Sequence, residues 1–259
     1  MTITLTGKVS GVADHHTSES LKRTFTHAWF VAPHMFYEGR LDEIPGDIAS
    51  ALGTGDLFPV MLFAHGSSGI GEPLKAFARF VASLGVGVVI PDSFVLEDRI
   101  TYSSPVSKAD YERVHALRSE ELLYAAANLD SLPGWDGRYV VAGTSEGGVA
   151  AARFSAPEIA PESGRILFSW SCEDNYHVES HRTHIPDNIP VLAIMSADDK
   201  YFGKGNPWLD NPDALGNPSK TLAKHPHATI VLIPGAPHTH FALPQTQDAV
   251  KAFLARVLA

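Results

Sequence analysis

Cysteine, basic charge and long apolar runs are all scarce in this chain of 259 residues. The single cysteine, Cys172, excludes an internal disulfide. Lysine and arginine number 20 against 29 acidic residues, for a formal charge of −9, and they form no cluster along any expected helix. A nucleic-acid binder needs such a basic surface, so nucleic acid is not an expected partner.

No apolar run approaches the roughly 18 residues that a membrane-spanning helix needs. The N-terminus also lacks the basic start and apolar core of a signal peptide. We therefore expect no membrane span and a cytoplasmic location. With 44% apolar residues, the chain has enough hydrophobic sequence to bury a sizeable core.

From residue 59 onward, short apolar runs rich in β-branched side chains alternate with longer segments of helical period. This alternation is typical of an α/β protein with a mostly parallel central sheet and helices on both faces. The expected strands cover residues 59–64, 86–91, 138–142, 165–170, 190–195 and 229–234. The expected helices cover residues 73–84, 107–129, 146–155 and 246–258.

The first 58 residues differ, because stretches of period two at residues 3–9 and 24–31 predict antiparallel strands that lead into the parallel sheet, followed by a loop. Two connections, residues 171–189 and 200–227, are long for a compact α/β protein. Such loops often carry function, so we expect them to shape a pocket. No boundary is visible, and we expect a single domain over residues 1–259.

The clearest chemical motif is Gly143-Thr144-Ser145-Glu146-Gly147. It follows an expected strand and precedes a helix rich in small residues, which is the setting of the G-x-S-x-G nucleophile elbow. A serine on so sharp a turn needs residues without bulk two positions before and after it. The turn also places the serine at a helix N-terminus, where developing negative charge is stabilised. Ser145 is therefore the candidate nucleophile.

A serine hydroxyl needs a base to remove its proton and an acid to orient that base. In enzymes with this elbow, the acid and then the histidine follow the serine along the chain. Asp198 and Asp199 follow the fifth expected strand, and His238 and His240 follow the sixth. The residues alone leave each partner open between two neighbours.

An HGSSG loop, the GTSEGG elbow, a strand running into aspartate and a G-A-x-H loop before the last helix occur in this order. The succession resembles the α/β-hydrolase superfamily, and over residues 59–259 it looks most like the dienelactone hydrolase family. That resemblance implies Asp199 rather than Asp198 as the acid, and His238 rather than His240 as the base. Dienelactone hydrolases proper carry a cysteine nucleophile, so the serine here points to the serine esterases of the same fold.

An acyl-transfer site also needs N–H donors aimed at the oxygen of the tetrahedral intermediate. Glu146, the residue after the nucleophile, supplies one by its position, and we expect the Gly-rich loop 65–69 to supply the other through Ser67. The side chain of Glu146 is expected to stay at its own helix terminus. Trp170, at the end of the fourth expected strand, and Tyr201, in a long loop, are candidates for the pocket wall.

Together these residues predict a cofactor-free serine hydrolase that cleaves a carboxylic ester or lactone of a small or medium-sized molecule. Ser145 attacks, His238 moves the proton and Asp199 orients His238. Acyl transfer, thioester hydrolysis and perhydrolysis use the same groups and stay open as alternatives. A non-catalytic protein on this fold is a further alternative. The sequence predicts no oligomeric state.

The 13 histidines suggest a metal site as a different interpretation. His177, His181 and His184 would share one face if their segment were helical, a spacing suited to a metal ion. Four further histidines lie later in the chain, at His225, His227, His238 and His240. However, Pro186 and Pro190 crowd the segment and no H-E-x-x-H motif occurs, so we expect no metal.

Overall fold

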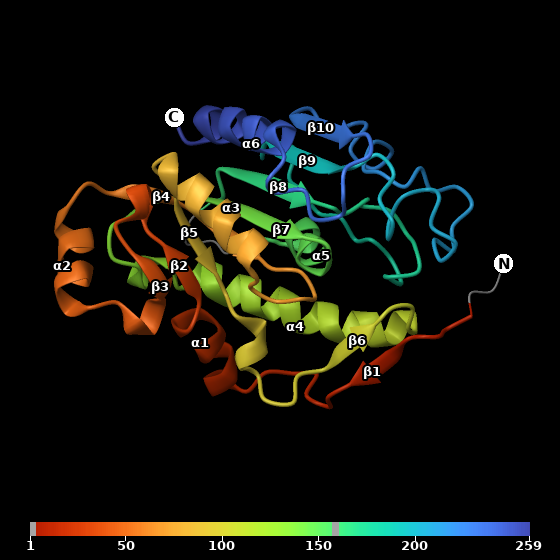
Figure 1. The fold of residues 1–259 in the computed structure, drawn as a ribbon, viewed down its shortest axis with the longest axis horizontal. Helices are drawn as coiled ribbons and strands as arrows, with labels where there is room; N and C mark the ends of the chain where they lie inside the picture. Colours follow the sequence, from red (N-terminus) through yellow and green to blue (C-terminus); the bar gives the residue numbers. More distant parts are fainter. Residues whose placement is uncertain (1–3, 157–160) are drawn as a thin grey trace.

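The computed structural model describes residues 4–156 and 161–259, which form an eight-stranded sheet in the order β10-β9-β8-β7-β4-β5-β2-β3 (Figure 1). Six of these strands are parallel to one another: β4 (Phe58–Ala64), β5 (Gly87–Ile90), β7 (Trp135–Thr144), β8 (Gly164–Phe168), β9 (Val191–Ser196) and β10 (Ala228–Ile233). They are the six strands that the apolar runs predict. Every residue of β5, β8 and β9 is buried, as expected for strands covered on both faces.

Antiparallel strands border this sheet, as predicted, but they are shorter than expected. β2 (Trp29–Val31) pairs with β5 on one side and with β3 (Glu38–Arg40) on the other. The first part of the predicted strand 24–31 instead belongs to α1 (Ser18–Thr26).

Two helices in the N-terminal segment were not predicted. α1 begins after Thr17, whose side chain accepts the N–H of Ser20 in a capping box. Ser20 occupies the position where glutamate or glutamine usually stands, so the start signal is weak in the sequence. α2 (Gly46–Thr54) lies in the segment expected to be a loop, and it has no capping side chain.

The first strand, β1 (Lys8–Ser10), does not join the main sheet. It pairs with β6 (Thr101–Ser103) in a separate antiparallel sheet of two strands. The predicted strand 3–9 therefore exists only near its end, and Ile3 lies outside the described residues. The described residues also contain four short 3₁₀ helices, at Pro33–Met35, Leu41–Glu43, Ser93–Val95 and Leu129–Ser131.

The four predicted helices cover both faces of the sheet, and each face has its own buried core. α3 (Glu72–Ser83) and α6 (Pro244–Val257) contribute apolar side chains to one core. α4 (Lys108–Ala127) and α5 (Glu146–Arg153) contribute to the other. Within residues 4–156 and 161–259, no helix combines the length and apolarity needed to cross a bilayer.

The elbow depends on a close approach between α5 and β4. A Cβ atom added to Gly147 would lie 2.0 Å from the carbonyl oxygen of Ala64. We expect Gly147→Ala to lower the free energy of unfolding, measured by urea denaturation, by about 3 kcal/mol. In the control Gly46→Ala, the added Cβ meets nothing within 4 Å. That variant should stay within about 0.5 kcal/mol of wild type, and equal losses in both would contradict the packing argument.

His115 of α4 makes the fold sensitive to acid. Its buried ring donates from Nε2 to the carbonyl of His177 at 3.0 Å. Burial lowers the pKa of His115 to about 4, from an ordinary value of 6.5. The unfolded chain therefore takes up a proton at a higher pH than the folded protein does, so stability is lost as the pH falls from about 6.5 to about 4.

We expect this group to contribute about 3 kcal/mol to the pH dependence of unfolding. In urea denaturation, His115→Gln should lose about 3 kcal/mol less stability than wild type between pH 7.5 and pH 4. Other titrating groups affect both proteins alike, so the difference between them isolates His115. If the free energy of unfolding falls with pH by the same amount in both proteins, His115 does not contribute to the pH dependence.

Candidate active site

Ser145 lies in the sharp turn between β7 and α5, where the elbow motif predicts it. Its φ of 54° and ψ of −116° are unusual for a residue with a side chain. Its backbone N–H donates to the carbonyl of Phe168 at 3.0 Å, which ties the turn to the neighbouring strand. α5 begins at Glu146, whose N–H belongs to the first turn and has no acceptor within the helix.

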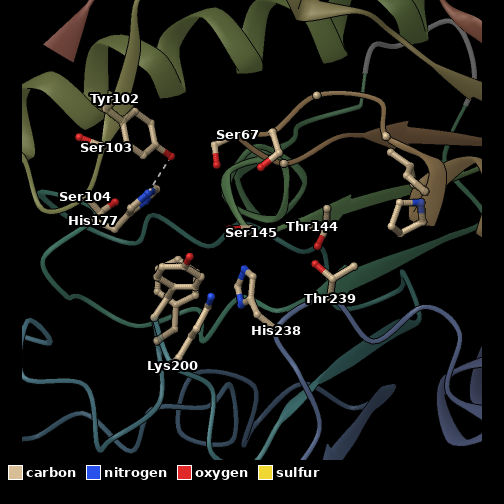
Figure 2. A pocket seen from close by; sticks show the side chains of 18 of the residues that line it. Ser67, Tyr102, Ser103, Ser104, Thr144, Ser145, His177, Lys200, His238 and Thr239 are labelled. Atoms are coloured by element: carbon tan, nitrogen blue, oxygen red, sulfur yellow. Dashed lines mark hydrogen bonds between the residues drawn. The ribbon is translucent and has the colours of Figure 1, made fainter. Parts of the chain in front are cut away.

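The structure brings Asp199 and His238 together beyond the ends of β9 and β10. His238 Nδ1 donates to Asp199 Oδ2 at 2.7 Å, and the Asp199 side chain is fully buried. The other carboxylate oxygen accepts the N–H groups of Tyr201 and Phe202 at 2.9 and 3.0 Å. Burial alone would raise the pKa of Asp199, but the bonds to His238 and to backbone outweigh it and leave that pKa below its ordinary value. The ring of His238 extends toward Ser145 (Figure 2).

The rival residues lie elsewhere. The side chain of Asp198 is exposed to solvent. His240 is buried, with Nδ1 at 2.9 Å from Thr246 Oγ1 and Nε2 at 3.2 Å from Ser169 Oγ. Neither residue lines the cavity next to Ser145. The structure thus pairs the two residues that the family resemblance implies.

Ser67 lies in the loop between β4 and α3, at the edge of the cavity (Figure 2). His65 holds this loop, since its Nδ1–H donates to the carbonyl of Gly66 at 2.7 Å and its Nε2 accepts the N–H of Ser93 at 3.2 Å. Burial and the neighbouring Arg118 hold the pKa of His65 well below its usual range. A neutral imidazole with a fixed tautomer therefore braces the loop.

A buried network of charged side chains lies next to the two backbone segments that carry the candidate oxyanion donors, Ser67 and Glu146. Arg99 Nη2 donates to Glu146 Oε1 at 2.9 Å, and Arg118 Nε lies 3.4 Å from the same oxygen. Arg118 also pairs with Glu121 and donates to the carbonyl of His65 at 2.9 Å. The Glu146 side chain therefore does not stay at its own helix terminus, because two arginines from distant elements bind it. No local motif marks this network in the sequence.

A cavity of about 720 Å³ opens beside Ser145, and His238 also lines it. Both long loops contribute to its wall, with Tyr176 and His177 from the first and Lys200, Tyr201, Phe202 and Trp208 from the region of the second. Tyr201 thus lies where we expected it, with its ring edge-on to that of His238 at a centroid distance of 4.7 Å.

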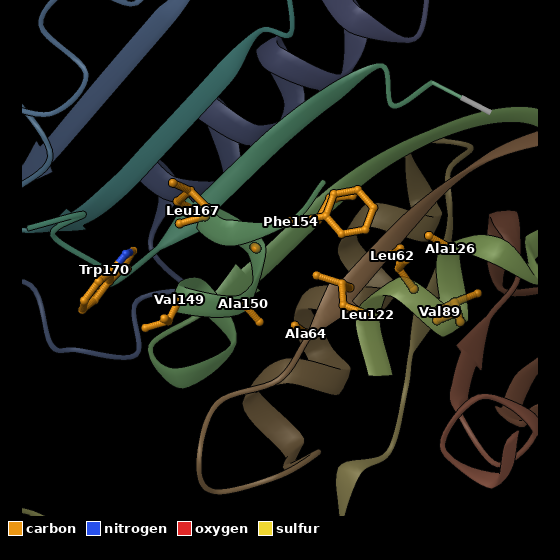
Figure 3. Close-up of a cluster of buried hydrophobic side chains, with 14 of the residues drawn as sticks. Leu62, Ala64, Val89, Leu122, Ala126, Val149, Ala150, Phe154, Leu167 and Trp170 are labelled. Carbon is orange, nitrogen blue, oxygen red and sulfur yellow. The ribbon is translucent and has the colours of Figure 1, made fainter. Parts of the chain in front are cut away.

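Trp170 does not line the cavity, which corrects the prediction made for it. Its side chain is buried in the core beside α5, close to Val149 (Figure 3). A Cβ atom on Gly148 would lie only 2.9 Å from Trp170 Cβ, so the helix packs directly on this residue. The Trp170 ring instead supports the wall from behind, edge-on to Phe202 at 4.9 Å.

Tyr102 and His177 are cavity residues that sequence reasoning missed. The Tyr102 hydroxyl lies 3.0 Å from His177 Nε2 (Figure 2). Burial raises the pKa of Tyr102 well above its usual value, and the nearby Glu146 carboxylate adds to this effect. Burial and the neighbouring His115 lower the pKa of His177 well below its usual value. Both side chains are therefore uncharged at neutral pH.

The premise of the alternative metal site is not met. Residues 177–184 contain no helix, so His177, His181 and His184 do not share a helical face. His181 Nδ1 instead lies 2.9 Å from Thr183 Oγ1. Across the described part of the chain, no group of three or more histidine, cysteine or carboxylate side chains is arranged to hold a metal ion.

The sequence matches no family model and no curated protein. In structure, the chain is similar to Est1E from Butyrivibrio proteoclasticus with bound ferulic acid, at 13% identity and a TM-score of 0.55, over 89% of this chain and 94% of that one. It is also similar to a putative dienelactone hydrolase from Klebsiella pneumoniae, at 16% identity and a TM-score of 0.54, over 78% and 87% of the two chains.

A cold-adapted esterase from an Arctic intertidal metagenomic library is similar as well, at 15% identity and a TM-score of 0.52, over 79% of this chain and 84% of that one. At these identities the likeness concerns the fold. Three features of the structure agree with this likeness in fold. They are the order of the strands in the sheet, the elbow between β7 and α5, and the positions of Asp199 and His238 after β9 and β10. The chain therefore has the α/β-hydrolase fold.

Proposed function

We propose that this protein is a serine hydrolase that cleaves carboxylic ester or lactone bonds of a small or medium-sized molecule. The observation that carries the proposal is the 2.7 Å bond between His238 and the buried Asp199, beside a serine held in a strained turn. A serine that only capped a helix would need neither the strain nor the pair. The cold-adapted esterase and the putative dienelactone hydrolase with the same fold agree with this proposal.

In the proposed mechanism, Ser145 Oγ attacks the substrate carbonyl while His238 Nε2, the ring nitrogen that Asp199 does not bind, removes the hydroxyl proton. The backbone N–H groups of Glu146 and Ser67 stabilise the negative charge on the tetrahedral oxygen. His238 then donates its proton to the leaving alcohol. Water, deprotonated by the same imidazole, then attacks the acyl carbon, and His238 returns the proton to Ser145 Oγ as the acid leaves.

The cavity favours a neutral or anionic substrate with an apolar or aromatic part. Tyr176, Tyr201, Phe202 and Trp208 line it, and their rings contact one another in a cluster. Among the described residues that line the cavity, Lys200 is the only lysine or arginine, and no aspartate or glutamate is present. A cationic substrate would therefore find no counter-charge in the wall.

A panel of p-nitrophenyl esters of increasing acyl length, with several lactones and one thioester, tests the reaction. We expect turnover by wild type and a loss of at least about 10³-fold in kcat for Ser145→Ala and for His238→Ala. A fluorophosphonate probe should label wild type at Ser145 and leave Ser145→Ala unlabelled. Turnover that survives Ser145→Ala would overturn the proposed function.

The neighbouring carboxylates provide a matched control. Asp199→Asn removes the acceptor that orients His238, and we expect kcat to fall by about 10³-fold to 10⁴-fold. Asp198→Asn changes the same functional group on an exposed side chain and should leave kcat within about twofold of wild type. The reverse pattern would assign the acid to Asp198.

Lys200 provides a test of charge selection. We expect Lys200→Glu to raise KM about fivefold for an ester with a carboxylate at the end of its acyl chain, and to leave KM for a neutral ester of equal length unchanged. The effect should shrink as salt is added, because salt screens exposed charges. Lys224→Glu makes the same charge change outside the cavity lining and serves as the control. Equal effects of the two substitutions would exclude a local role for Lys200.

A further inference from the structure

Two successive residues at the end of β8 hold the two residues that react in the proposed mechanism. The carbonyl of Phe168 accepts the backbone N–H of Ser145 at 3.0 Å. The hydroxyl of the next residue, Ser169, donates to the backbone carbonyl of His238 at 2.5 Å. Both residues are therefore bonded to adjacent positions, Phe168 and Ser169, at the end of one strand.

Besides the bond from His238 to Asp199 after β9, the loop that carries His238 has few other bonds to the sheet within the described residues. Its backbone bonds include Ala236 N–H to the Ile233 carbonyl at 3.4 Å and Leu243 N–H to the His240 carbonyl at 3.1 Å, and both stay within the connection from β10 to α6. The Ser169 hydroxyl, by contrast, reaches the loop from a different strand. It acts at the residue whose position the proposed reaction requires.

The direction of each proton around Ser169 follows from the chemistry of its partners. A carbonyl oxygen only accepts, so the single hydroxyl proton of Ser169 points to the carbonyl of His238. We therefore assign His240 the tautomer in which Nε2–H donates to the Ser169 oxygen at 3.2 Å. In a neutral imidazole the other nitrogen is an acceptor, so Thr246 Oγ1–H donates to His240 Nδ1 at 2.9 Å.

Every member of this chain is shielded from water. Ser169, His240 and Thr246 expose 1%, 1% and 0% of their surfaces. Burial and the neighbouring His238 lower the pKa of His240 to about 4, so the ring stays neutral at the pH where His238 would act. Ser169 also holds a φ of 50°, which is uncommon for a residue with a side chain, and its N–H donates to the carbonyl of Ile194.

We propose that Thr246, His240 and Ser169 form an uncharged hydrogen-bond relay that positions His238 against Ser145. The inference rests on the proposed function, since it gives these three residues a task in that same site. His240, the rival candidate for the base, is thereby a positioning residue that acts through Ser169. The relay begins in the first turn of α6 and ends at the backbone of the base, so it couples that helix to the site.

Thr246 provides the sharpest test, because two substitutions separate its hydroxyl from its shape. Thr246→Val removes the donor to His240 Nδ1 and keeps the volume, whereas Thr246→Ser keeps the donor and loses one methyl group. We expect Thr246→Val to lower kcat about tenfold and Thr246→Ser to stay within about twofold of wild type. KM should change less than about twofold in both, because Thr246, His240 and Ser169 are not among the residues that line the cavity.

Ser169→Ala removes the link to His238 directly, and we expect a loss in kcat of about 10-fold to 100-fold, again with KM within about twofold. All rates are expressed per active site, counted from the final amount of fluorophosphonate bound, so misfolded protein does not enter them. The rate of fluorophosphonate labelling should fall with kcat. If Ser169→Ala does not fold, the Thr246 pair decides the question alone.

Three results would overturn the relay. The first is a kcat of Thr246→Val within twofold of wild type, and the second is a loss in Thr246→Ser as large as that in Thr246→Val. The third is a loss that appears in KM rather than in kcat. Failure of the proposed function is recognised separately, because wild type would then neither hydrolyse the esters nor label at Ser145.

Discussion

The strained turn at Ser145 is the constraint on which the rest of the site depends. A serine at φ 54° costs on the order of 1–3 kcal/mol, and such a conformation persists only where its surroundings enforce it. Here the enforcement comes from backbone packing. A Cβ atom on Gly143 would lie 2.1 Å from the carbonyl oxygen of Gly147, and the Ser145 N–H is bound to the carbonyl of Phe168. Glycine at both positions lets β7, β4 and α5 approach closely enough to hold the serine up at the end of the sheet.

The burial of charged side chains near the site also costs free energy, because these groups lose their contact with water. Removing Arg99, Arg118, Glu121 and Glu146 from water is expensive, and the ion pairs among them offset part of that cost without adding much stability. Their placement suggests what they do. Arg118 binds the carbonyl of His65 at the start of the Gly-rich loop, and Arg99 binds the side chain of Glu146 at the start of α5. The network therefore links the two backbone segments that the proposed mechanism uses to hold the tetrahedral oxygen.

The sequence predicted the elements whose signals are local. Six apolar runs became the six parallel strands, because a strand buried on both faces leaves a continuous apolar record. α4 begins just after Ser107, close to the expected start of the helix at residue 107, and the Ser107 hydroxyl accepts the N–H of Asp110 as a cap. α1 and α2 were missed because their capping signals are weak or absent. Contacts between distant residues left no trace in the sequence either. Trp170 packs on α5 instead of lining the cavity, and Tyr102 reaches the cavity from a small separate sheet.

The many histidines of the chain gain a physical interpretation from burial. His65, His177 and His240 surround the proposed site, and each has a pKa below its ordinary value because it is buried. In His65 and His240 both ring nitrogens are hydrogen-bonded, so each neutral ring keeps a fixed pattern of one donor and one acceptor, whereas His177 is bonded through Nε2 to the Tyr102 hydroxyl. Two histidines line the cavity, within the part of the chain that the structure describes, and of these only His238 binds a carboxylate. Under the proposed function the roles of the histidines differ: the buried neutral rings make fixed hydrogen bonds, and His238, whose Nδ1 donates to Asp199, is the ring that moves the proton.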